Sequence, residues 1–333
     1  MNPADGAAAR PRIPAGVWAL GFVSLLMDIS SEMIHSLLPL FLVGTLGMSV
    51  LAVGLIEGIA ESTALITKVF SGVLSDWSGR RKPLALAGYA LGAATKPVFA
   101  LATGVGAVVA ARVVDRIGKG IRGAPRDALV ADLTPPSIRG AAYGLRQSLD
   151  TVGAFVGPLL ATALMLLWAN DFRAVFWVAA IPGALAVLLL LVGVREPERT
   201  AHTRPTSPIR REALARLGRA YWQVVALGAV FTLARFSEAF LVLRAAELGV
   251  PAAWMPMVMV AMSAVYAATA YPFGKLSDAM DHRTLLAWGL GYMGQPHILA
   301  RFMAAQDYAT MKNARRFGMT WMIVCLFGAM AVG

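Results

Sequence analysis

The sequence Gly72-Val-Leu-Ser-Asp-Trp-Ser-Gly-Arg-Arg-Lys82 follows an apolar segment, and part of it recurs 202 residues further along the chain. The second copy reads Gly274-Lys-Leu-Ser-Asp278 and is followed, at the same spacing, by Arg283. We interpret the repeat as the mark of a duplicated six-helix half. The alternative interpretation is two unrelated turns, each with a Ser-Asp helix cap.

The composition excludes an ordinary soluble protein. Of the 333 residues, 58% are hydrophobic and 15% are charged, whereas soluble domains average about 45–50% and about 25%. The mean hydropathy is +0.64. Because backbone polar groups in lipid need internal partners, we predict an all-α membrane protein, a polytopic helical bundle. Its ten apolar segments span residues 15–43, 50–74, 84–103, 105–125, 141–167, 173–194, 220–243, 254–273, 284–300 and 317–333.

The net charge of +11 is better explained by membrane orientation than by a nucleic-acid partner, because the cations gather in alternate loops. Residues 75–83 carry a net charge of +2 and residues 195–219 carry +4, whereas 44–49 and 103–106 carry none. Cytoplasmic loops are enriched in Lys and Arg. We therefore expect a multi-pass membrane protein with a cytoplasmic N-terminus.

The motif at 72–82 resembles the loop signature of the major facilitator superfamily, and its place after the second segment matches that family. A bacterial branch of the family is also similar at Asp115-Arg-Ile-Gly-Lys-Gly120, Pro125-Arg-Asp127 and Arg139-Gly140. The resemblance covers about 15–286. It implies twelve helices in two six-helix halves, which carry a small molecule across the bilayer by alternating access.

The same resemblance implies a gating loop that latches the two halves in the outward-facing state. Carboxylate–arginine bonds would form the latch. The alternative is a basic turn that only directs membrane insertion. The residues concerned are Gly72, Asp76, Gly79, Arg80 and Arg81, with Gly274, Asp278 and Arg283 in the second copy.

The last stretch of the chain has a different resemblance. Residues 286–303 and 314–323 are similar to the sodium:proline symporter of the sodium–solute symporter family. This resemblance implies that three residues line a substrate path, and it is the one indication of sodium as a partner: Trp288, Tyr292 and Pro296. Because the two families have unrelated folds, we infer a chimera joined near 285–291, with the facilitator half cut short.

Four regions follow from these observations. We expect an N-terminal six-helix facilitator half over 1–194 and a cytoplasmic basic linker over 195–219. The start of a C-terminal half then occupies 220–285, and a symporter-like tail occupies 286–333.

Acidic residues inside the first two apolar segments are candidate proton-coupling or substrate sites, because ionisable groups in membrane helices are costly. Asp28 and Glu32 are four residues apart, as are Glu57 and Glu61. Two carboxylates so close in a low dielectric resist joint ionisation, so one of each pair should hold a proton. The alternative is that basic residues neutralise them as structural ion pairs.

The fourth segment and its extension carry six charged residues within an arc of about 120° of the helix: Arg112, Asp115, Arg116, Lys119, Arg122 and Arg126. We expect Arg112 and Arg116 to face the bundle interior, near the acids of the first two helices. Arg122 and Arg126 are expected to extend to the cytoplasmic interface. Such a cationic face also suits an anionic substrate.

The fifth segment contains Arg146 and Asp150, an i,i+4 pair, followed by Gly153-x-x-x-Gly157-Pro158. Small residues at this spacing permit close helix packing, and in the family a Gly-Pro motif here slightly favours antiport. Lys96 with Pro97, and Arg235 with Glu238, are lesser candidates for which structural pairs are the simpler interpretation.

No phosphate-binding loop, metal-ligand cluster or nucleophile–base pair stands out, and Cys325 is the single cysteine. We therefore predict a protein that is not an enzyme and holds no cofactor or metal. The leading hypothesis is a proton-coupled secondary transporter of a small solute, with efflux slightly favoured. The alternatives are a sodium-dependent proline symporter fragment and a membrane protein without transport activity.

The topology of the tail gives a first prediction. If 284–300 spans the membrane, the following loop lies outside with a net charge of +3, against the charge rule. We therefore expect a poorly inserted or re-entrant tail. An Asn313→Cys variant without Cys325 should resist impermeant thiol reagents added outside the cell, and clean extracellular labelling would contradict the prediction.

Overall fold

The computed structural model describes residues 12–196, 218–219, 222 and 237–265. Its contacts divide the chain into two compact units. The first comprises Met1–Ile34, Ile59–Gly157 and Asp171–Ser207, and the second comprises His35–Gly58, Pro158–Asn170 and Pro208–Gly333.

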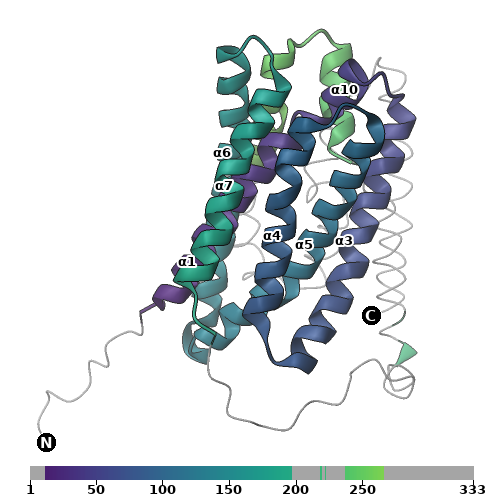
Figure 1. The fold of residues 1–333 in the computed structure, drawn as a ribbon. Helices are drawn as coiled ribbons and strands as arrows, with labels where there is room; N and C mark the ends of the chain where they lie inside the picture. The colour runs from purple at the N-terminus through teal and green to yellow at the C-terminus, as the bar shows by residue number, and fades with distance from the viewer. Residues whose placement is uncertain (1–11, 197–217, 220–221, 223–236, 266–333) are drawn as a thin grey trace, which may run out of the picture. The chain divides into compact units, whose positions relative to one another are not determined.

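Six long helices form the framework of the part described, and Figure 1 draws them in chain order from purple to teal. Their bounds agree with the predicted segments to within a few residues at most ends. The exceptions are the first, which ends at His35 and not at residue 43, and the fourth, which continues past the predicted end at residue 125 to Leu133. The helices are α1 (Ala15–His35), α3 (Val50–Ser78), α4 (Arg81–Leu101), α5 (Val105–Leu133), α6 (Arg139–Leu167) and α7 (Phe172–Gly193).

Shorter elements complete the described structure. After α1, the short α2 (Leu38–Leu40) contains Pro39, and one π-helical turn, η1 (Phe41–Thr45), follows it. Proline lacks the N–H that would continue the helix without a break. A 3-10 turn, η2 (Pro136–Ile138), precedes α6.

The end of the seventh predicted segment, 220–243, falls within a described helix. That helix, α10, runs Ala239–Glu247, and most of 220–236 lies outside the described residues. The hydroxyl of Ser237 accepts a hydrogen bond from the backbone N–H of Ala239 at 3.3 Å, which favours a helix start there. The 3-10 turn η3 (Ala252–Trp254) then leads into an apolar helix that is described as far as Val265.

Several predicted features lie outside the described residues. They are most of the basic linker, the segments 284–300 and 317–333, the second motif copy with Gly274, Asp278 and Arg283, and the tail residues Trp288, Tyr292 and Pro296.

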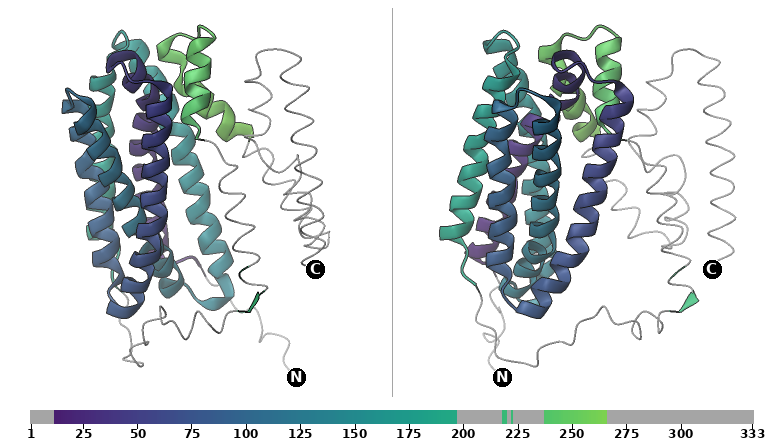
Figure 2. Two further views of the ribbon diagram at one scale, coloured as in Figure 1. Left: turned by 90° about the vertical axis from the view of Figure 1, so that its right-hand side faces the viewer. Right: turned by 45° about the vertical axis from the view of Figure 1, so that its right-hand side comes forward.

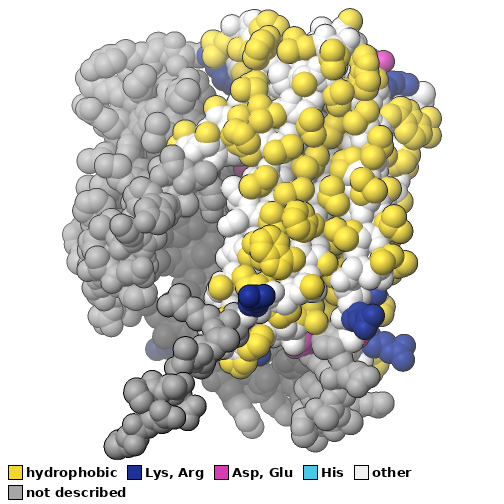
Figure 3. Space-filling model, turned by 90° about the vertical axis from the view of Figure 1, so that its left-hand side faces the viewer, with side chains coloured by type: hydrophobic (Ala, Val, Ile, Leu, Met, Phe, Trp, Pro, Cys, Tyr) yellow, Lys and Arg dark blue, Asp and Glu magenta, His cyan; other side chains and the backbone are white. Residues whose placement is uncertain are grey.

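The outer surface of the helices has the character of a lipid-facing surface. Five helical segments of the described part are long and apolar enough to cross a membrane. On α7, exposed apolar side chains recur every three or four residues, and Figure 3 shows hydrophobic side chains across one face with Lys and Arg near its ends. The chain is therefore an all-α, multi-pass membrane protein. Contrary to our prediction, α5 is not one of these five segments, because it carries too many charged residues.

Glycines let α4 and α5 approach each other backbone to backbone, and Figures 1 and 2 show the two helices side by side. A Cβ on Gly118 would lie 2.8 Å from the carbonyl oxygen of Gly88 and 2.9 Å from the backbone nitrogen of Gly92. Real Cβ atoms avoid such distances, so no larger residue fits. Small residues four apart are typical of closely packed membrane helices.

Lys96 joins three helices inside this unit. Its side chain is fully buried on α4, and its Nζ lies 2.8 Å from Oδ1 of Asp115 on α5. The same ammonium group donates a hydrogen bond to the hydroxyl of Ser31 on α1 at 3.2 Å. A buried ion pair of this kind tolerates poorly the loss of one partner, because the other charge then stays buried alone.

We predict that Lys96→Met destabilises the protein by about 3–5 kcal/mol, because the buried carboxylate of Asp115 loses the ammonium group that it pairs with. Denaturant unfolding of the detergent-solubilised protein, followed by circular dichroism, measures the change. The double variant Lys96→Met/Asp115→Leu should recover most of the loss. A single variant as stable as the parent would contradict the prediction.

Candidate functional site

The acidic residues of α1 lie against the two glycines of α6. A Cβ on Gly153 would lie 3.0 Å from Cβ of Asp28 and 2.6 Å from the carbonyl oxygen of Leu25. One turn further along, a Cβ on Gly157 would lie 2.8 Å from Cβ of Glu32. The predicted close packing at this glycine pair is therefore confirmed, and each glycine makes room for one acidic residue.

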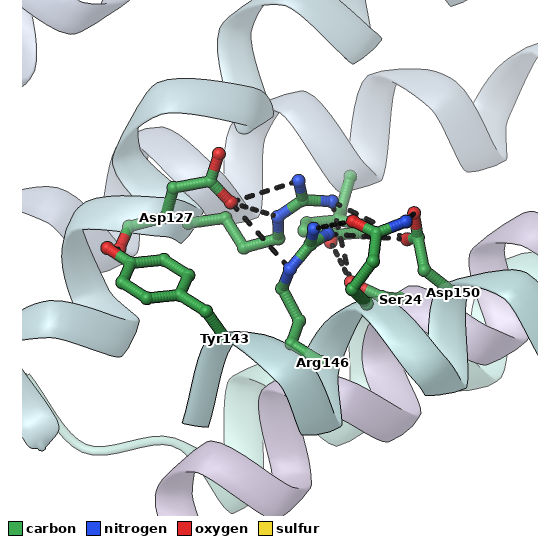
Figure 4. A network of polar contacts seen from close by, with 8 residues as sticks. Ser24, Asp127, Tyr143, Arg146 and Asp150 are labelled. Atoms are coloured by element: carbon green, nitrogen blue, oxygen red, sulfur yellow. Dashed lines mark hydrogen bonds and ion pairs between the residues drawn. The ribbon is translucent and has the colours of Figure 1, made fainter. Parts of the chain in front are cut away.

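A polar network connects α1, α5 and α6 beside this contact (Figure 4). Arg146 and Asp150 form the predicted i,i+4 pair, with Nη1 3.4 Å from Oδ1. Arg126 on α5 lies with Nη1 3.9 Å from the same Asp150 oxygen and 3.4 Å from the hydroxyl of Ser24 on α1. Arg126 therefore lies between the two helices that carry Asp28 and Asp150.

Asp127 holds the α5 end of this network. Its Oδ1 lies 3.0 Å from Nη2 of Arg126 and 4.0 Å from Nε of Arg146. The hydroxyl of Tyr143 on α6 donates to the backbone carbonyl of Asp127 at 2.8 Å. Our sequence analysis did not single out Asp127 or Tyr143, although Asp127 belongs to the Pro-Arg-Asp motif that carries the family resemblance.

Arg116 on α5 pairs with Glu61 on α3. Its Nη1 lies 3.1 Å from Oε1 of Glu61, and the guanidinium is 3% exposed while the glutamate side chain is 54% exposed. Arg116 therefore lies next to an acid of the second helix, as we predicted. One turn along α5, Lys119 interacts electrostatically with Glu61, Asp28 and Glu32.

Two further predicted residues are buried. Arg112 on α5 is 3% exposed, as expected for an inward-facing residue. Glu57 on α3 is 6% exposed, and it belongs to the second unit, whereas Glu61 belongs to the first.

The structure corrects the expectation for Arg122. Instead of extending to the interface, this side chain is 5% exposed, and its guanidinium carbon lies 4.9 Å from the ring centre of Tyr89 on α4. A cation over an aromatic face is stabilised by the quadrupole of the ring. The hydroxyl of Tyr89 also lies 3.5 Å from the hydroxyl of Ser24. We did not predict a role for Tyr89 from the sequence. A polar aromatic residue within an apolar segment was the available signal.

The loop between α3 and α4 is organised around Arg81. Its Nη1 lies 2.8 Å from Oδ2 of Asp132 on α5, and its Nη2 lies 3.5 Å from Oδ1 of Asp76. Gly79 adopts a positive φ of 68°, a conformation that glycine reaches without steric cost. The neighbouring Arg80 is exposed, and a Cβ on Gly72 would make an ordinary 3.4 Å contact with Ala124 of α5.

Glu196, at the start of the predicted linker, caps the N-terminus of α4. Its two carboxylate oxygens accept hydrogen bonds from the backbone N–H groups of Arg81 at 2.7 Å and Lys82 at 2.9 Å. A carboxylate is favourable there because the first N–H groups of a helix have no internal partners and the helix dipole is positive. Lys82 in turn donates through Nζ to the carbonyl of Leu191 on α7 at 2.8 Å.

Comparison with known proteins extends these observations. The family model of the Major Facilitator Superfamily matches residues 20–333. An uncharacterized MFS-type transporter of Methanocaldococcus jannaschii is 32% identical over 280 residues, which are 82% of this chain and 69% of that protein. An uncharacterized protein of Mycobacterium tuberculosis is 33% identical over 186 residues, 55% of this chain and 45% of its own length.

A short segment has a second set of relatives. The sodium/proline symporter of Escherichia coli K12 is 66% identical over 50 residues, which are 15% of this chain and 10% of the symporter. The facilitator model also extends to residue 333, past the end at 286 that we expected. Together the matches fit a facilitator protein that contains a symporter-like segment.

Solved structures show the same fold at low sequence identity. A bacterial homologue of the human lysosomal transporter Spinster, in an inward-facing and occupied conformation, has a TM-score of 0.62 at 20% identity. That match covers 95% of this chain and 72% of the homologue. A POT family transporter in complex with 5-aminolevulinic acid has a TM-score of 0.53 at 19% identity, over 66% of this chain and 46% of the transporter.

The methanogen relative and the solved structures are described as transporters, although this chain spans about half the length of some of the proteins that it matches. The family model covers almost all of the chain, and the methanogen relative is similar over most of both proteins. The chain belongs to the Major Facilitator Superfamily.

Proposed function

We propose that this protein is a secondary transporter that moves a small solute across the membrane in exchange for protons. The observation that carries the proposal is the placement of Asp28 and Glu32 within α1, where each lies against a glycine of α6. Carboxyl groups in membrane helices are costly to keep ionised. Groups that take up and release protons under these conditions are suited to coupling.

Cations on α5 supply the partners that such a cycle needs. Arg116 is buried and holds Glu61, and Lys119 interacts with Asp28, Glu32 and Glu61. When a carboxylate gains a proton, the cation that it held becomes available to another anion. A charged solute could then exchange with the proton at this face of the bundle.

The resemblance of Gly157-Pro158 to an antiporter motif supports export as the direction. The basic loops support a cytoplasmic N-terminus, so Arg81, Asp76 and Arg80 would lie on the cytoplasmic side as a gate. Asp132 and Glu196 belong to the same gate by contact, because both bind the Arg81 residue.

A sodium-dependent proline symporter is the second candidate, on the strength of the 66% identical segment. That segment corresponds to 10% of the symporter. Sodium-stimulated proline uptake by this chain would favour this second function over proton exchange.

The coupling proposal predicts that Asp28→Asn and Glu32→Gln each lower solute-driven proton flux at least tenfold in proteoliposomes. A trapped pH dye reports the flux while a panel of solutes is added, including a dipeptide, 5-aminolevulinic acid, and proline with and without sodium. Neutral amides keep the side-chain volume but bind no proton.

The matched control is Asp171→Asn. Asp171 is an exposed acid that accepts hydrogen bonds from the N–H groups of Arg173 and Ala174, and asparagine also caps helices well. Its proton flux should equal that of the parent. Unchanged flux in both Asp28→Asn and Glu32→Gln would contradict the coupling proposal.

The gate predicts a separate effect for Arg81→Lys. Lysine keeps the charge but cannot reach Asp76 and Asp132 with two nitrogens at once. We expect normal insertion with a flux that is reduced about fivefold, roughly 1 kcal/mol of lost preference between the two states. Arg139→Lys, at the exposed start of α6, is the control. Equal fluxes for the two variants would contradict a gating role for Arg81.

A further inference from the structure

We propose that Asp28 and Asp150 bind one proton between them, and that this carboxyl pair between α1 and α6 is the proton-binding site. This inference rests on the proposed function and specifies its site. It differs from the sequence-based pairing, in which the partners are neighbours along one helix.

The first observation is the distance between the helix backbones. Cβ of Asp28 lies 3.0 Å from the position that a Cβ on Gly153 would occupy. Asp150 stands three residues before Gly153, almost one turn away on the same face of α6. The crossing of α1 and α6 therefore brings the two carboxyl groups to one place.

The second observation is the interaction between the two groups. The side chains of Asp28 and Asp150 interact electrostatically across the contact between α1 and α6. An ionised carboxylate can only accept hydrogen bonds, so two carboxyl groups bond to each other only when one carries a proton. One shared proton converts a repulsive pair into an attractive contact between α1 and α6.

The charged groups around the pair stabilise its deprotonated state. Lys119 and Arg122 of α5 interact electrostatically with Asp28. Asp150 has Arg146 at 3.4 Å and Arg126 at 3.9 Å, and the side-chain amide of Gln147 lies 3.5 Å from its Oδ2. Nearby cations therefore stabilise each carboxylate when the shared proton leaves.

Arg126 is placed to respond to that change. Its Nη1 donates to Ser24, one turn before Asp28, and the same nitrogen is 3.9 Å from Asp150. Figure 4 shows Ser24 and Asp150 next to each other on the two helices. Loss of the shared proton strengthens the pull of Asp150 on Arg126 and removes the bond between α1 and α6. The protonation state is thereby linked to the packing of three helices.

The other acid pairs are less suited to sharing a proton. Asp28 and Glu32 lie against different glycines, Gly153 and Gly157. Glu61 forms an ion pair with Arg116 at 3.1 Å, which favours its ionised form. Asp28 and Asp150, by contrast, lie on two helices that are in close contact at Gly153.

Infrared difference spectroscopy of the reconstituted full chain between acidic and alkaline pH tests the inference without any solute. The parent should show one protonated-carboxyl band that disappears as pH rises. Asp28→Asn and Asp150→Asn should each abolish that same band, because each removes half of the pair. Asp171→Asn, which changes an exposed carboxylate outside the site, should leave the band in place.

A band that persists in either aspartate variant, or two bands lost one by one, would overturn the inference. If Asp150→Asn does not fold, Asp150→Glu provides the test, because the longer side chain should shift the titration of the band by about half a pH unit or more. An unshifted titration would also overturn it.

The experiment separates this inference from the proposed function. A band shared by Asp28 and Asp150 in a protein without solute-driven proton flux would support the site and refute transport coupling. Proton flux that survives in Asp150→Asn, with an unchanged band, would support coupling and refute the pair.

Discussion

Where α1 crosses α6, Leu25 and Asp28 of one helix lie so close to Gly153 of the other that a single Cβ there would come within 2.6 Å of a backbone oxygen. Other parts of the first unit depend on this contact and on the similar one between α4 and α5. In lipid, helices gain nothing from hiding apolar surface from water, so close packing and polar contacts hold them together. Glycine allows both close packing and polar contacts, because it has no side chain and leaves room for a neighbouring backbone or a short acidic side chain.

Close packing also explains how so many charges exist inside the bundle. Arg126, Arg116 and Lys96 on two adjacent helices each meet an acid: Asp150, Glu61 and Asp115, respectively. An isolated ion in the membrane is costly, and each pair reduces that cost. The Lys96 pair is fully buried, while the glutamate of the Arg116 pair is half exposed. The buried pair joins its helices inside the bundle, whereas the carboxylate of Glu61 stays accessible.

The loop after α3 is also held by contacts between charged groups. Arg81 contacts Asp76 and Asp132, while Glu196 binds the first N–H groups of α4. The beginning of the basic linker is thereby attached to the loop whose signature identifies the family.

Hydropathy alone predicted the six long helices, because a backbone in lipid must form its own hydrogen bonds and a helix is the one local way to do so. Pairs along one helix were also predictable, as Arg146 and Asp150 show, since the helical repeat places residues four apart side by side. The hydrogen bond from the N–H of Ala239 to Ser237 at the start of α10 is a detail that hydropathy does not indicate.

Contacts between helices required the tertiary structure. The stacking of Arg122 on Tyr89, the bond between Lys96 and Asp115, and the approach of Asp28 to Asp150 join residues on different helices. Their positions depend on where two helices cross and how each is rotated about its axis. The sequence by itself determined which residues are ionisable and which helix carries them. Only the tertiary structure decided their partners, because crossing points arise from the packing of whole helix surfaces.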